Sequence, residues 1–77
     1  MSATTLARLV RMANQIAAEF ANQRPDAAAA TAEHIRLFWD PRLLAMLRAH
    51  GAAGGDGLSP VAAAATAMLR GGSADGG

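Results

Sequence analysis

The two histidines, His34 and His50, are the side chains from which acid–base chemistry would have to begin, because histidine exchanges protons most readily near neutral pH. Glu33 precedes His34, but neighbours on a helix project about 100 degrees apart, so a proton relay between them is not expected. We expect His34 at a helix surface or interface. His50 is expected near a helix C-terminus, where it can favour the dipole or donate to a terminal carbonyl. Neither is predicted to be catalytic.

Metal and phosphate sites have equally weak support in the sequence. Two histidines and scattered carboxylates lack the clustered spacing of a transition-metal site. The absence of Cys removes thiolate catalysis and cysteine-ligated zinc or iron–sulfur clusters. The Gly-rich stretch 51–57 has no Lys followed by Ser or Thr and no preceding strand, so it is not a P-loop. We therefore predict no catalytic, cofactor-binding or metal-binding residue.

A DNA-reading helix-turn-helix around Asp40 and Pro41 is a second class of function that a short helical chain can raise. A recognition helix needs several polar side chains that reach base edges, whereas residues 42–48 form an apolar segment with Arg42 and Arg48 at its ends. The net charge is only +1. These features argue against a nucleic-acid partner.

Phe38 and Trp39, flanked by Arg36 and Arg42, are the residues best suited to contact another protein. Trp and Arg are enriched in interface hot spots, and a chain of 77 residues has a small core in which to bury two rings. The alternative is that both rings belong to the core; we expect Phe38 to point inward and Trp39 to be shared with a partner. All seven cations are Arg, which reflects either codon composition or a preference for forked contacts to carboxylates. The candidate partner interface comprises Arg36, Phe38, Trp39, Arg42, Leu43 and Met46.

The elements that must position these residues are helices, since the chain has no Tyr, two Val and no sustained alternation of apolar and polar residues. The predicted fold is all-α: a small bundle of about four short helices within a single domain over residues 1–70. The first helix is expected over residues 5–22, with Arg8, Arg11, Gln15 and Glu19 facing solvent. Its predicted apolar stripe contains Leu6, Leu9, Val10, Ala13, Ile16, Ala17 and Phe20.

A second helix is expected to begin near Asp26, after the break at Pro25. Its small residues 27–32 allow close backbone approach but are expected to contribute little burial. Most of its apolar side chains lie at the C-terminal end, in Ile35, Leu37, Phe38 and Trp39.

Two Pro-containing pairs predict the starts of the next helices. Asp40 is the expected N-cap and Pro41 the first residue of a third helix, with Trp39 packing on Leu44 as a hydrophobic staple. Ser59 and Pro60 repeat the arrangement for a fourth helix, whose apolar residues are Val61, Ala64, Ala65, Met68 and Leu69.

The connecting and terminal segments are rich in Gly. Gly51 is the expected left-handed stop of the third helix, near His50, and residues 51–57 are expected to form a flexible connection. Residues 71–77 are expected to form a disordered tail. The N-terminal residues do not have the pattern of a secretory signal and no stretch matches a membrane span, so a cytoplasmic location without a membrane partner is expected.

Three blocks of the sequence resemble the delta subunit of soluble NAD-dependent formate dehydrogenase. They are residues 9–17 (LVRMANQIA), 34–42 (HIRLFWDPR) and 55–60 (GDGLSP), and they occur in the order found in that family. The central block is the most specific of the three, because Ala-rich amphipathic helices are common.

The resemblance implies a small non-catalytic subunit of a cytoplasmic bacterial complex that oxidises formate to carbon dioxide and reduces NAD. The large (alpha) subunit of such a complex holds a molybdenum or tungsten bis-pterin guanine dinucleotide centre and iron–sulfur clusters, while the other subunits (beta and gamma) hold FMN and further clusters. No catalytic residue carries over to this chain. The leading hypothesis is an accessory subunit that binds the alpha subunit and stabilises the holoenzyme. The alternatives are a transient factor for insertion or protection of the metal–pterin cofactor, and an unrelated helical protein-interaction module.

Overall fold

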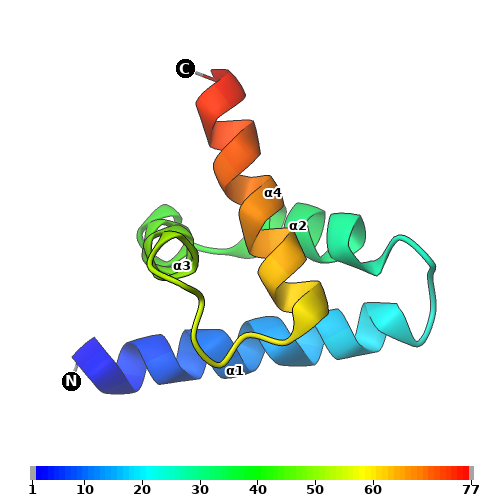
Figure 1. The fold of residues 1–77 in the computed structure, drawn as a ribbon, viewed down its shortest axis with the longest axis horizontal. Helices are drawn as coiled ribbons and strands as arrows, with labels where there is room; N and C mark the ends of the chain where they lie inside the picture. Colours follow the sequence, from blue (N-terminus) through cyan, green and yellow to red (C-terminus); the bar gives the residue numbers. More distant parts are fainter. Residues whose placement is uncertain (1, 77) are drawn as a thin grey trace.

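The computed structural model describes residues 2–76, with side chains described for residues 5–69 (Figure 1). Its helices are α1 (Ser2–Ala21), α2 (Ala27–Phe38), α3 (Pro41–Ala52) and α4 (Pro60–Gly76). Residues 2–76 contain no strand, so the predicted all-α bundle of four helices is confirmed. No helix in this range is long and apolar enough to cross a lipid bilayer.

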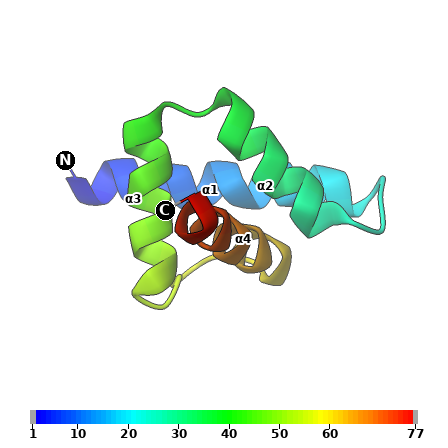
Figure 2. The same cartoon turned by 90° about the horizontal axis from the view of Figure 1, so that it is seen from above.

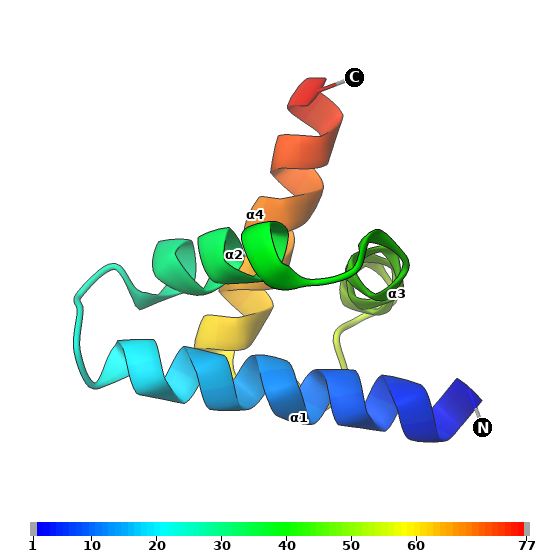
Figure 3. The same cartoon turned by 180° about the vertical axis from the view of Figure 1, so that it is seen from behind.

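The helices cross one another rather than lying in parallel. In Figure 1, α1 forms the base and α2 runs above one half of it. The view from above shows α3 crossing over the N-terminal half of α1 (Figure 2), and the view from behind shows α4 rising from α1 past α2 (Figure 3). α4 contacts each of the other three helices. The core therefore lies where α4 meets α1, α2 and α3.

The amphipathic pattern predicted for α1 is confirmed. Leu9, Ala13 and Ala17 are buried along one stripe, flanked by half-buried apolar residues. The opposite face, with Arg8, Arg11, Gln15 and Glu19, is exposed. The helix starts earlier than predicted, at Ser2, and ends at Ala21.

Small residues fill most of the buried positions of α2 and α4, the two helices whose contacts are the most extensive. The buried residues of α2 are Ala27, Ala30, Thr31, Ala32 and Ile35. Those of α4, over the side chains described, are Ala62, Ala65, Thr66 and Leu69. The expectation that residues 27–32 contribute little burial was wrong, because side chains of this size let two helix backbones approach closely enough to exclude water from both.

α3 does not end where predicted. Gly51 lies inside the helix, and the glycines with positive φ are Gly54, Gly55 and Gly57. The N–H of Gly55 donates to the carbonyl of His50 at 2.8 Å and that of Gly54 to the carbonyl of Gly51 at 3.2 Å. These two bonds make a Schellman motif with Gly54 as its left-handed residue. The stop therefore lies three residues beyond Gly51.

The backbone of α4 continues to Gly76, past the expected end of the fourth helix. The expected tail, residues 71–77, falls beyond the described side chains, and its last residue falls outside the described range. The disorder expected there stays a prediction, as does the boundary of the domain at residue 70.

Candidate partner-binding surface

The turn from α2 to α3 is built by two extended residues and a cap. Trp39 (φ −88°, ψ 144°) donates its N–H to the carbonyl of Ile35 at 3.0 Å and ends α2. Asp40, held in extended conformation by the following proline, accepts the N–H of Arg42 at 2.7 Å through its carboxylate. Pro41 occupies the first position of α3. Every bond of this corner is local in sequence, which is why the residue pattern predicts it.

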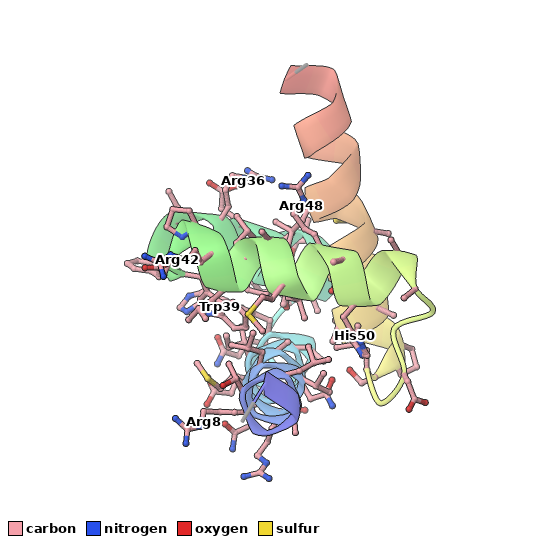
Figure 4. All side chains as sticks on the ribbon, turned by 90° about the vertical axis from the view of Figure 1, so that its left-hand side faces the viewer. Arg8, Arg36, Trp39, Arg42, Arg48 and His50 are labelled. Carbon is pink, nitrogen blue, oxygen red and sulfur yellow. The ribbon has the colours of Figure 1, made fainter. Side chains whose placement is uncertain are left out.

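Trp39 belongs mainly to the fold. It is half-buried and packs against the hydrophobic core, as does Leu44, the residue expected to pair with it. Figure 4 places Trp39 on the side of α3 that faces α1. The ring therefore fixes α3 over α1, and only part of it remains accessible.

Phe38 points outward, and the prediction that it faces the core was wrong. Its side chain is 71% exposed. Its ring lies 4.9 Å from that of His34, whose ring lies 6.1 Å, edge to face, from that of Phe20 on α1. Long helical side chains lean back over the preceding turn, so Phe38, in the last position of α2, covers His34 instead of reaching the core. These three residues form an aromatic row along the edge of the bundle.

Leu37 is an exposed apolar residue that the predicted interface omits. Its side chain is 65% exposed, beside Phe38. It lies about 200° around the helix from Ile35, the fully buried residue of this turn. Measuring helical phase from Ile35, instead of treating residues 35–39 as one apolar run, would have identified Leu37 from sequence.

Two arginines at the corner differ in their pairing. Arg36 donates to the carboxylate of Glu33 at 2.7 Å on the same helix. Arg42 is exposed, and its guanidinium has no acidic partner among the described residues. Figure 4 shows Arg42 at the outer end of α3, far from Arg8, which projects beyond α1. Of the two charges, that of Arg42 is thus the one left without a counter-ion.

The remaining members of the predicted interface, Leu43 and Met46, lie on α3 and are half-buried. The structure thus brings the six predicted residues to one corner, where Arg36, Phe38 and Arg42 are exposed and Trp39, Leu43 and Met46 are half-buried. We use the name corner surface for the four exposed side chains Arg36, Leu37, Phe38 and Arg42.

The start of α4 has an additional partner that sequence reasoning missed. Ser59 Oγ accepts the N–H of Ala62 at 3.2 Å, and Pro60 is the first helical residue. Asn14 of α1 accepts the N–H of Ser59 at 2.9 Å and donates to the carbonyl of Gly57 at 3.0 Å. The position of Asn14 beside the apolar stripe of α1 was the signal in the sequence for this role, but its partners lie more than forty residues away.

The histidines have structural contacts. His34 lies within the aromatic row, and Nε2 of His50 lies 2.7 Å from the carbonyl oxygen of Asp56, in the loop after α3. That bond, the Asn14 bonds and a turn from Leu58 N–H to the Gly55 carbonyl at 3.0 Å hold the connection that we expected to be flexible. Among the side chains described, those of residues 5–69, no three His, Asp or Glu gather as metal ligands.

Taken together, the fold and the corner surface define a small all-α protein that presents large apolar side chains beside an arginine. The chain belongs to the family of the NADH-dependent formate dehydrogenase delta subunit FdsD, whose family model matches residues 8–66. The match spans α2, α3, most of α1 and the first part of α4, and it includes the three sequence blocks that resemble this family. Comparisons with curated proteins and with solved structures gave no match.

Proposed function

We propose that this chain is a non-catalytic accessory subunit of a cytoplasmic NAD-dependent formate dehydrogenase, and that it binds the large catalytic (alpha) subunit and stabilises the assembled holoenzyme. The observation that carries the proposal is the exposure of two adjacent large apolar side chains, Leu37 and Phe38, in a member of the delta subunit family. Adjacent exposed apolar residues of this size are typical of sites that another protein covers.

The limited core supports a role in which this chain and the larger subunit stabilise each other. The large apolar residues buried among the described side chains are Leu9, Ile35, Leu47 and Leu69, and the other buried positions hold Ala or Thr. Chains of this length commonly rely on an added constraint such as oligomerisation, since their core supplies little free energy. Docking on a larger subunit would provide that constraint and would also cover apolar surface on the larger subunit.

The chemistry is assigned to the other subunits. The alpha subunit would hold the molybdenum or tungsten bis-pterin centre with iron–sulfur clusters, and the beta and gamma subunits would hold FMN, further clusters and the site for NAD. A chain without cysteine offers no thiolate for an iron–sulfur cluster, which agrees with this division.

Deletion of the chain tests the proposal. The yield and thermal half-life of the purified complex are compared with and without it, at equal metal and FMN content. The expected result is less intact complex and a shorter half-life, both restored by supplying the chain in trans. An equal yield of equally stable enzyme would refute a stabilising role. If cells that express the chain yield fully active enzyme that no longer contains it, that result would instead support a transient cofactor-insertion factor.

A further inference from the structure

We propose that Leu37 and Phe38 are the anchor by which this chain docks, that they enter an apolar recess on the large subunit, and that Arg42 pairs with a carboxylate at the rim of that recess. This inference rests on the proposed function and adds the contact residues and the chemistry of the partner's surface.

The corner surface holds the two most exposed large apolar residues of the described chain. Four large hydrophobic residues are exposed among the described side chains: Met12 at 37%, Met68 at 45%, Leu37 at 65% and Phe38 at 71%. The last two are neighbours and the most exposed. The connection that follows them lies at the outer edge of the molecule (Figure 2), so a concave surface could enclose them.

Phe38 is held in place before binding. Its ring rests 4.9 Å from that of His34, and His34 is braced by Phe20 from another helix. A ring ordered in the free protein loses less side-chain entropy on association than a ring that binding must first immobilise. His34 and Phe20 are thus positioning residues for the anchor.

The two arginines of the corner surface differ in whether an acidic residue balances their charge. Glu33 already neutralises Arg36, and the guanidinium of Arg42 lacks an acidic partner within residues 5–69. A guanidinium presents a planar fork that fits a carboxylate through two parallel hydrogen bonds. The partner's surface is therefore expected to carry Asp or Glu beside the recess.

A second copy of this chain fits the corner surface poorly. A two-fold interface centred there would place Arg42 close to its own copy, and facing like charges weaken association. Each partner in a stable interface buries about 800 Å², roughly a sixth of the 4794 Å² of accessible surface here. Two protruding corners meet over a small area, whereas a recess can surround one corner.

The test is a binding titration of the full-length chain against the purified formate dehydrogenase complex that lacks it. Phe38→Ala and Leu37→Ala are each expected to weaken binding by at least about tenfold, as hot-spot residues do. Arg42→Glu should weaken it by about tenfold and reduce its sensitivity to salt. Met68→Ala on α4 and Arg8→Glu on α1 are the matched controls, since both alter exposed residues of other helices, and they should bind like the unmodified chain.

Two further measurements make each outcome decisive. Circular dichroism melts should coincide for all five variants, because each altered side chain is exposed. If the complex does not assemble without the chain, the variants are compared by the amount of large subunit that co-purifies after co-expression.

Wild-type affinity retained by Phe38→Ala and Arg42→Glu would overturn this inference and leave the accessory role intact. An unmodified chain that does not bind at all would overturn the proposed function itself. In sedimentation experiments the isolated chain is expected to be a monomer; a dimer that Phe38→Ala dissociates would assign the surface to a second copy instead.

Discussion

The side chain of Asn14 completes the N-terminal cap of a helix that begins forty-six residues later, by accepting the backbone N–H of Ser59 at 2.9 Å. Ser59 Oγ satisfies the N–H of Ala62 within the helix, so the cap is shared between a local residue and one from α1. The amide nitrogen of Asn14 holds the carbonyl of Gly57 at 3.0 Å. One side chain therefore ties both the loop and the start of α4 to α1.

Replacing Asn14 should destabilise the whole fold. Asn14→Ala removes two hydrogen bonds and leaves a partly buried N–H of Ser59 without its acceptor, so the free energy of unfolding should fall by about 1–2 kcal/mol. Urea denaturation followed by circular dichroism measures this loss. The control is Gln15→Ala, which alters the next, exposed residue of the same helix. Equal urea midpoints for the two variants would show that the hydrogen bonds of Asn14 contribute nothing to stability.

Thr31 should be replaceable with a gain in stability. Its side chain is fully buried and its hydroxyl has no hydrogen-bond partner among the described residues, whereas the hydroxyl of Thr66, equally buried on α4, donates to the carbonyl of Ala62 at 2.8 Å. Thr31→Val keeps the shape and removes an unsatisfied polar group, which should raise the free energy of unfolding by about 1 kcal/mol. Thr66→Val, measured in the same urea titration, should give no gain. A Thr31→Val variant that is less stable than the Thr66→Val variant would contradict this prediction.

Trp39 and Phe38 should separate stability from binding. Trp39 packs on the core while half-buried, so Trp39→Ala should cost about 2–3 kcal/mol, less than the roughly 3–5 kcal/mol of a fully buried ring. Phe38→Ala, at an exposed position, should change stability by no more than about 0.5 kcal/mol. Guanidinium denaturation followed by far-UV circular dichroism compares the variants. Similar losses for both would mean that the two rings share one structural role.

The link between α1 and α2 should respond to acid through Asp26. Two hydrogen bonds from the Arg24 guanidinium, both 2.8 Å long, lower the pKa of the Asp26 carboxyl, and the charge of Arg24 adds to the effect. Because the folded-state pKa lies below that of the unfolded chain, the pairing stabilises the fold above the unfolded-state value and is lost as pH falls through the folded-state value.

An NMR titration of the Asp26 carboxyl carbon checks this shift. Arg24→Gln should move the pKa of Asp26 upward toward its ordinary value, while the melting temperature at neutral pH should hardly change, because exposed ion pairs contribute little. The unmodified chain is the reference. An identical Asp26 titration in both proteins would show that Arg24 is not the cause.

The features that the sequence predicts well are those determined by neighbouring residues. The Asp40 and Ser59 caps depend on bonds to residues two or three positions away, and the structure has both. The apolar stripe of α1 depends on helical periodicity alone. The delta subunit family was also identifiable from three short blocks, which the family match over residues 8–66 includes.

The features that were mispredicted depend on where other helices end or cross. Phe38 follows the apolar phase of α2, yet it lies past the last turn that the core covers. Which glycine ends α3 depends on the bonds made by the carbonyls of His50 and Gly51, and composition does not distinguish Gly51 from Gly54. The role of Asn14 depends on a partner that only the tertiary fold brings near.

The close crossing of α2 and α4 also affects how this sequence can change over evolution. Alanines such as Ala32, Ala62 and Ala65 look interchangeable with any helix-forming residue, but each is nearly inaccessible and belongs to the hydrophobic core. A larger side chain at these positions would force the helices apart, while the bulky Leu37 can vary without disturbing the fold. As far as the fold is concerned, these small buried side chains should therefore tolerate fewer substitutions than large exposed ones.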